Sequence, residues 1–349
     1  MINYIMTTMD TYIFSSLIIR IVLAFLTTFL LSIIFGNKAI ALLRAKQGKG
    51  QPIREDGPQS HLLTKKGTPT MGGLLIIATT LISCLFWAKW SNIFVLTSLA
   101  VLVIYAFVGF LDDYEKVKKQ TSNAMSAKMK LLLQFSVSFI CVLIITYATP
   151  DNIKYDLRFP SIYPIFSTFS INLFWFYIPF AMVVIAGASN AVNLTDGLDG
   201  LAAGLLTTIF IFFIMTCLET SFIINGTQEV AVICSAVAGA CLGFLWFNCA
   251  PAKIFMGDTG SLALGALRGT ISVLTKSEIV LAIVGLIFVI EAVSVMIQIF
   301  WFKRTGKRFF KMAPIHHHFE QMGIPETTIV IRFWIIGILL AAFGLIAVY

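Results

Sequence analysis

The chain has 349 residues, of which 58% are hydrophobic and only 12% are charged, and its mean hydropathy is +0.90. A soluble domain carries about 25% charged residues, so this composition excludes an ordinary water-soluble fold. The net charge of +8 does not indicate nucleic-acid binding, because the basic residues follow the loops between apolar segments. We therefore predict an all-α polytopic membrane protein without a nucleic-acid partner.

Ten apolar segments recur along the chain and predict about ten transmembrane helices. The first, residues 13–35, carries one charge at Arg20, and about 23 helical residues reach roughly 34 Å, enough to cross a bilayer. The segment that contains Arg268 is short and glycine-rich, so we expect it to be tilted or broken. The other segments are residues 72–87, 93–111, 131–147, 171–186, 201–218, 230–246, 262–274, 279–302 and 329–348.

The distribution of basic residues predicts the orientation in the membrane. Of the 25 Lys and Arg residues, 18 lie on one set of alternating loops, which the positive-inside rule places in the cytoplasm. An even number of spans then puts both termini outside. We predict a single integral membrane domain, 1–349, whose main cytoplasmic loops are residues 37–69, 112–130, 187–200, 247–261 and 303–328.

The first two of these loops bring polar groups to the membrane surface. Lys65 and Thr70 precede the second span and could hold an anionic substrate at a helix start, although lysines there also satisfy the positive-inside rule. Asp112 and Asp113, in "FLDDYEK", are either a polar stop signal or chemical groups. Glu115 and Lys116 are interpreted as plain surface residues.

The third and fourth loops repeat this pattern. In "NAVNLTDGLDGLAAG", Asn193, Asp196 and Asp199 exceed what capping of one helix needs, and the glycines allow close approach of a ligand. In "FNCAPAKIFMGDTGSLALG", the residues of interest are Asn248, Lys253, Phe255 and Asp258, which suit base stacking, phosphate contact and metal ligation. No P-loop motif is present.

The last loop contains His316, His317 and His318 in "MAPIHHHFEQMG". Adjacent histidines do not easily converge on one ion, so hydrogen bonding to phosphate or sugar oxygens is favoured over zinc binding. Within the membrane, Glu291 and Gln298 share one face of a helix, as an interhelical polar pair or, for Gln298, as part of the pocket lining.

Five acids on three loops of one membrane face predict a bound cation, because clustered carboxylates repel one another strongly. Oxygen ligands without Cys favour Mg²⁺, and Mg²⁺ with lysines indicates phosphoryl transfer. The acids are Asp112, Asp113, Asp196, Asp199 and Asp258.

The same loops resemble the phospho-N-acetylmuramoyl-pentapeptide transferase family of the polyprenyl-phosphate sugar-1-phosphate transferase superfamily. The resemblance covers essentially the whole chain, and "APIHHHFE" points to the muramoyl-pentapeptide branch. It is carried by "QPIREDGPQSHLLTKKGTPTMGG", "GFLDDYEK", "NAVNLTDGLDGLA", "FMGDTGSLALG" and "MAPIHHHFE". The sequence departs from the family pattern at Arg268, in a span that is usually rich in Gly and Ala.

This resemblance implies a multi-pass enzyme of the bacterial plasma membrane that acts in peptidoglycan synthesis. Its implied reaction joins undecaprenyl phosphate to UDP-N-acetylmuramoyl-pentapeptide, giving lipid I and UMP with Mg²⁺ as cofactor. It also implies that Asp112, Asp113 and Asp258 are catalytic and that Asp258 ligates Mg²⁺. Lys128 and Lys130 are expected partners of the lipid phosphate.

The resemblance also implies a pocket for the soluble substrate. Its nucleoside region is expected to contain Asn193, Asp196, Asp199, Asn248 and Phe255, with Phe255 stacked on uracil. The adjoining part is expected to contain Lys65, Thr70, Gln298, His316, His317 and His318.

Several alternatives remain open at this point. A direct displacement oriented by Asp112 and a two-step route through an aspartyl-phosphate are both chemically sound. A sister transferase that moves N-acetylglucosamine-1-phosphate is the nearest rival. A secondary transporter is less favoured because its ionisable site would lie near the bilayer midplane. The oligomeric state is also open, with a homodimer as one alternative.

Overall fold

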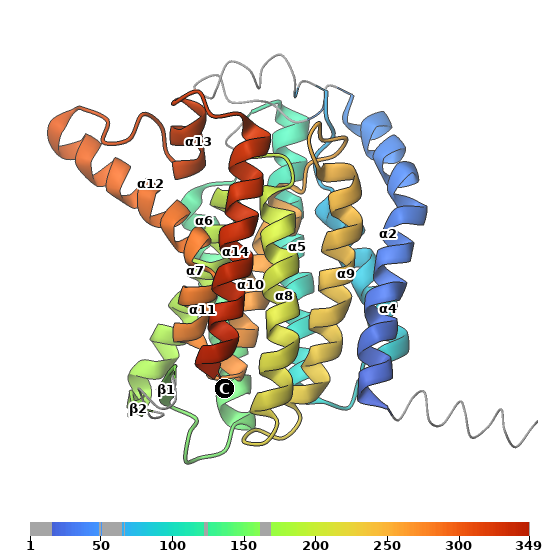
Figure 1. Ribbon diagram of the computed structural model, residues 1–349, viewed down its shortest axis with the longest axis vertical. Helices are drawn as coiled ribbons and strands as arrows, with labels where there is room; N and C mark the ends of the chain where they lie inside the picture. Colours follow the sequence, from blue (N-terminus) through green and yellow to red (C-terminus); the bar gives the residue numbers. More distant parts are fainter. Residues whose placement is uncertain are drawn as a thin grey trace, which may run out of the picture.

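The computed structural model describes residues 16–48, 50, 65, 67–121, 125–160 and 169–348. These residues form a helical bundle with one two-stranded hairpin (Figure 1). The elements are α2 (Leu17–Gln47), α4 (Gly73–Trp87), α5 (Ile93–Lys119), α6 (Ala127–Ala148), β1 (Asp156–Phe159), β2 (Phe169–Asn172), η1 (Phe174–Phe176), α7 (Tyr177–Thr195), α8 (Leu201–Thr220), η2 (Thr227–Glu229), α9 (Val230–Asn248), α10 (Gly257–Leu274), α11 (Glu278–Val284), α12 (Leu286–Thr305), α13 (Ile315–Glu320) and α14 (Glu326–Val348).

The long apolar helices confirm a polytopic membrane protein. Within the described residues, eight helices are long and apolar enough to cross a bilayer, and α4 is a shorter apolar helix. The amino end of α2 and the carboxyl end of α14 lie at the same end of the bundle (Figure 1). The count of ten spans and the outward orientation of the termini stay predictions.

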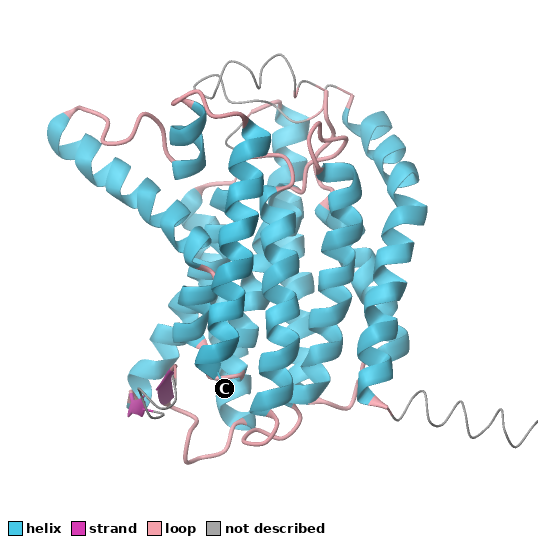
Figure 2. Ribbon diagram, viewed as in Figure 1, coloured by secondary structure: helices cyan, strands magenta, loops and turns pink. Residues whose placement is uncertain are grey.

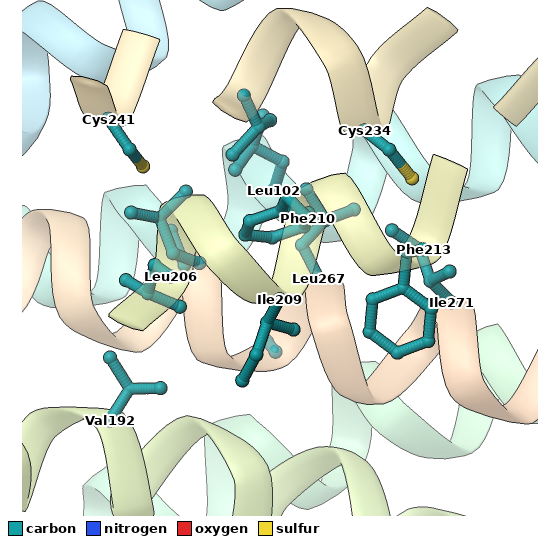
Figure 3. Packing of buried hydrophobic residues seen from close by; sticks show 14 of the residues in the cluster. Leu102, Val192, Leu206, Ile209, Phe210, Phe213, Cys234, Cys241, Leu267 and Ile271 are labelled. Carbon is teal, nitrogen blue, oxygen red and sulfur yellow. The ribbon is translucent and has the colours of Figure 1, made fainter. Parts of the chain in front are cut away.

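The core lies where α8, α9 and α10 pack together with α5 and α7. Every residue of α10 is buried, which matches a helix surrounded by protein on all sides. Gly73 and Gly109 let α4 and α5 approach the backbone at the start of α10, where a side chain would overlap Gly260 or Asp258. Figure 3 shows part of this packing, with Leu102, Val192, Leu206, Ile209, Phe210, Phe213, Cys234, Cys241, Leu267 and Ile271 labelled.

Several helices extend beyond the predicted apolar spans into the segments predicted as cytoplasmic loops. The helical parts of these cytoplasmic segments are residues 37–47, 112–119 and 187–195. The apolar pattern stops at the bilayer surface, whereas the backbone hydrogen bonds of a helix continue into the polar region. Asp112, Asp113 and Asn193 therefore sit on helical turns and have fixed directions.

The predicted span 279–302 consists of two helices, α11 and α12, which are separated at Gly285. After this break α12 slants away from the bundle (Figure 1). Arg268 does not snorkel to water: it is fully buried beside the break, with its guanidinium 4.0 Å from the centre of the Phe288 ring. The break gives α12 a direction that apolar periodicity alone does not predict.

Between α6 and α7, strand β1 pairs antiparallel with β2. The register aligns Asp156 with Asn172 and Phe159 with Phe169. Figure 2 shows these strands at the end of the bundle opposite to α13. The hairpin adds a little strand to a fold that is otherwise helical, as predicted.

Candidate active site

A lysine–aspartate cluster joins the end of α5 to the start of α10. Lys116 Nζ lies 2.6 Å from Asp112 Oδ2 and 3.1 Å from Asp258 Oδ1. Lys130 Nζ, from α6, lies 2.9 Å from Asp112 Oδ2 and 2.7 Å from Asp258 Oδ2. The two ammonium groups therefore bridge two buried carboxylates that are far apart in sequence. We call Asp112, Lys116, Lys130 and Asp258 the bridged cluster.

Asp113 points to the other side of α5 and closes the amino end of α10. Its Oδ1 accepts from the backbone N–H of Asp258 at 3.1 Å, and its Oδ2 accepts from Thr259 N–H at 2.9 Å. The Thr259 hydroxyl donates to the same Oδ2 at 2.7 Å. Because the first N–H groups of a helix have no partner within the helix, Asp113 acts as a cap supplied by another helix.

Gly257 allows Asp113 and the start of α10 to come this close. Its φ of +73° favours glycine. A Cβ at Gly257 would lie 2.5 Å from Asp113 Oδ2 and 2.7 Å from Thr70 Oγ1. The "MGD" sequence thus places Asp258 directly after a residue that has to be glycine.

The carboxyl end of α7 adds an amide and a third carboxylate beside the bridged cluster. Asn193 Nδ2 donates to Asp258 Oδ1 and to Ser261 Oγ, each at 2.9 Å. Burial and the nearby charges of Asp258 and Asp113 raise the pKa of Asp196 to about 7. Burial first, and the neighbouring carboxylates second, therefore oppose the ionisation of Asp196.

A second charged group lies at the start of α8. Lys65 Nζ is 2.9 Å from Asp199 Oδ1 and 2.7 Å from Glu326 Oε1. Burial lowers the pKa of Lys65, but the charges of Asp199 and Glu326 outweigh that effect and raise it above the usual value. Asp199 Oδ2 also accepts from Ala252 N–H at 2.9 Å, so this group ties three loops together.

The Asn248 side chain bonds the backbone of two of these loops, whereas Thr70 is held through its own backbone. The Asn248 side chain accepts from Gly200 N–H at 3.1 Å and donates to the Ile254 carbonyl at 2.9 Å. The backbone of Thr70 is held on both sides by the Gln47 amide at 2.9 Å, and its buried hydroxyl has no hydrogen-bond partner among the described residues. The Thr70 hydroxyl is thus available to a ligand.

The three histidines have different partners at Nδ1. His316 Nδ1 is 3.0 Å from Glu291 Oε2, and both side chains are fully buried. His317 Nδ1 is 2.6 Å from Glu320 Oε2, while His318 Nδ1 accepts from Lys311 N–H at 3.1 Å. The rings of His316 and His317 nevertheless lie 4.1 Å apart, centre to centre, and Nε2 of each approaches Gly197.

The carboxylate oxygens of the site are the kind of ligand that a hard divalent cation prefers. Asp112, Asp196 and Asp258 offer oxygen atoms only, and their crowding is the kind that a cation would relieve. In the described part of the chain, no three His, Cys, Asp or Glu side chains are already arranged as ligands of one ion. Lys116 and Lys130 compensate the carboxylate charge of Asp112 and Asp258 instead.

Some predicted residues lie at the margin of the site. Lys128 is exposed, unlike Lys130 two residues later. Gln298 accepts from the N–H groups of Phe309 and Phe310 at 3.2 and 2.9 Å, so it holds the loop after α12. Phe255 is half-buried and its N–H donates to Pro69, which fixes the backbone that carries its ring. Residues 51–64 lie outside the described part of the chain.

The interpretation of Lys116 as plain surface was wrong. Glu115 lies at the surface, as interpreted, where it pairs with Lys119. Lys116 lies four residues after Asp112, a spacing that would have revealed the contact had the helix been extended. Glu326 was also missed as a member of the site. No pattern in the sequence connects it with Lys65, because the two residues are brought together only by packing of α14.

The chain is similar in sequence to known proteins over most of its length. Residues 93–276, more than half of the chain, match the family model described as glycosyl transferase family 4. Residues 65–77 match signature 1 of phospho-N-acetylmuramoyl-pentapeptide-transferase. The phospho-N-acetylmuramoyl-pentapeptide-transferase of Ruegeria pomeroyi is 50% identical over 332 residues, covering 92% of this chain and 91% of that protein. The chain belongs to the phospho-N-acetylmuramoyl-pentapeptide transferase family.

Further members of the family are similar over the same length. The protein of this name from Ruegeria sp. is 50% identical over 333 residues, covering 92% of this chain and 91% of the relative. That from Caulobacter vibrioides is 48% identical over 334 residues, covering 93% and 90%. The chain is therefore a membrane transferase of the bacterial plasma membrane, as its apolar helices also indicate. The matched signature includes Lys65 and Thr70.

Proposed function

We propose that the chain transfers phospho-N-acetylmuramoyl-pentapeptide from its UDP derivative to undecaprenyl phosphate, giving lipid I and UMP. The observation that carries this proposal is the bridged cluster, in which Lys116 and Lys130 each contact both Asp112 and Asp258. Two ammonium groups beside two carboxylates suit a reaction between two phosphate groups. The family membership and the membrane-spanning helices support the choice of substrates.

In this proposal one phosphoanhydride replaces another. An oxygen of undecaprenyl phosphate forms a bond to the phosphorus attached to the sugar, and the bond from that phosphorus to the oxygen of UMP breaks. Asp112 orients the lipid phosphate and accepts its proton when one is present. Lys116 and Lys130 exchange their carboxylate contacts for phosphate oxygens, which compensates the charge of the reacting groups.

We further propose Mg²⁺ as the divalent cation, with Asp258 as its ligand. When bound, Mg²⁺ supplies charge neutralisation at the diphosphate and at the leaving UMP. The buried position of Asp258 at the first turn of α10 and its two lysine contacts support an electrostatic role. Asp113 is a poor nucleophile for a two-step route, because both of its oxygens accept hydrogen bonds from α10.

We place the soluble substrate beside the bridged cluster. Lys65 is proposed to contact its diphosphate, and the Thr70 hydroxyl is a further donor. Asn193, Asp196 and Phe255 would surround the nucleoside, with the Phe255 ring stacked on uracil. The histidines of α13 border this region through the contact of His316 with the loop at Gly197.

The test uses purified protein with undecaprenyl phosphate, Mg²⁺ and one UDP-sugar at a time, and measures release of UMP. Release from the muramoyl-pentapeptide donor, and little from UDP-N-acetylglucosamine, is the expected result. Release from UDP-N-acetylglucosamine alone would favour the sister reaction. Failure to release UMP from the muramoyl-pentapeptide donor would overturn the proposal.

A further inference from the structure

Glu291 is a buried acid to which the proposed reaction gives no role. It lies on α12, its side chain is fully buried, and its Oε2 is 3.0 Å from His316 Nδ1. A carboxylate within a membrane protein is costly to bury, so it usually has a partner and a function. In the described part of the chain, Glu291 Oε1 has no hydrogen-bond partner, which leaves His316 as the polar contact of this carboxylate.

The other ring nitrogen of His316 faces the loop at Gly197. A Cβ built on Gly197 would overlap His316 Nε2, so this nitrogen lies directly against the loop between Asp196 and Asp199. His316 Nε2 is buried without a hydrogen-bond partner among the described residues. Because leaving a buried nitrogen unpaired costs free energy, His316 Nε2 is a candidate acceptor for a ligand that binds at the loop of Gly197.

We propose that Glu291 is a positioning residue that holds the His316 imidazole so that Nε2 is presented to the soluble substrate. An ionised carboxylate only accepts hydrogen bonds, so Nδ1 carries the proton and donates to Oε2. The contact fixes both the ring orientation and the tautomer, as carboxylates do for ligating histidines. This inference rests on the proposed function, because it assigns the nitrogen to the UDP-linked substrate.

Two features of the fold make the pair specific. Glu291 lies within the part of α12 that follows the break at Gly285, so the direction of α12 sets where the carboxylate meets α13. Gly197 has no side chain, so the imidazole can approach the loop that also carries Asp196. Glu291 and Gly197 therefore constrain the same ring from opposite sides.

The kinetic experiment compares Glu291→Leu with Glu291→Gln, whose amide oxygen still accepts from Nδ1–H. We expect kcat/KM for the UDP substrate to fall roughly 10–100-fold in the Leu variant, mainly through KM, and to recover largely in the Gln variant. The KM for undecaprenyl phosphate stays unchanged. Gly197→Ala, which pushes the ring away, is expected to resemble the Leu variant.

A double-mutant cycle with His316→Ala separates positioning from general damage. If Glu291 acts through His316, the double variant is no worse than His316→Ala alone. Glu278→Leu is the matched control, because Glu278 is a buried carboxylate at the other end of the bundle that bonds Tyr177. Normal kinetics in Glu291→Leu, losses that multiply in the double variant, or an equal KM change in Glu278→Leu would each overturn the proposal.

A substrate-free measurement keeps this inference distinct from the proposed function. The chain has four histidines, so ¹⁵N-imidazole NMR of the whole protein can follow His316 after assignment with His316→Gln. We expect Nδ1 to be protonated in the wild type and the tautomer population to shift in Glu291→Leu. An unchanged tautomer would overturn the inference even if UMP is released, whereas absence of UMP release with a shifted tautomer would overturn only the function.

Discussion

Asp113 caps α10 through Thr259: its Oδ2 accepts from both the N–H and the hydroxyl of Thr259, at 2.9 and 2.7 Å. Its neighbour Asp112 faces the lysines instead. Two consecutive aspartates on one helix therefore have different contacts. Asp113 accepts hydrogen bonds from the start of α10, whereas Asp112 pairs with two ammonium groups. Substitutions at the two positions should separate stability from activity.

Asp113→Ala is expected to lower the free energy of unfolding by about 2 kcal/mol, because several donors at the start of α10 lose their acceptor. Asp113→Asn retains one acceptor oxygen and should recover part of that loss. Thermal unfolding of the detergent-solubilised protein measures both variants. A wild-type melting temperature for Asp113→Ala would contradict the capping role.

Asp112→Asn is expected to reduce UMP release roughly 10²–10⁴-fold, because the lipid phosphate loses its acceptor and orienting group.

Lys116→Ala should also lose most of its activity, since the Lys116 ammonium contacts both carboxylates of the bridged cluster. Lys118→Ala is the control, because Lys118 is exposed on the same helix. Equal activities of the Lys116 and Lys118 variants would remove Lys116 from the site.

Gly257→Ala should destabilise the protein and impair activity, because the residue combines a φ of +73° with close approach to Asp113 and Thr70. Gly187→Ala is the matched control: Gly187 is helical, and nothing lies within 4 Å of where its Cβ would be. That replacement should be neutral or slightly stabilising. Melting temperatures that are the same for both variants would argue against the constraint at Gly257.

The raised pKa of Asp196, about 7, predicts a pH-dependent stability in the absence of divalent cations. Between the ordinary aspartate pKa near 4 and about 7, the folded state holds a proton that the unfolded state has released. Stability should therefore fall as pH rises through this window and then level off above pH 7.

Asp196→Asn removes this contribution, so its melting temperature relative to the wild type should rise with pH from about 4.5 to 7. The measurement is thermal unfolding in the presence of a chelator at a series of pH values. A constant difference between the two proteins across that range would contradict the raised pKa.

Apolar composition and the positions of charged residues determined the class of the protein. The lipid-facing helices have to be long and apolar, and this requirement is visible in any single segment. The aspartate, asparagine and histidine motifs could also be recognised one by one, because each is contiguous. Their gathering at one end of the bundle followed from alternating topology, and the structure places Asp112, Asn193 and Asp258 together.

The tertiary structure alone decided which of these groups touch one another. Lys116 contacts Asp258 because α5 continues past the apolar segment, and Glu291 meets His316 because the break at Gly285 sets the direction of α12. Hydropathy cannot locate either feature, since helix ends outside the bilayer and breaks inside it depend on local packing. The different contacts of Asp112 and Asp113 arise for the same reason, because neighbouring residues on a helix point about 100° apart.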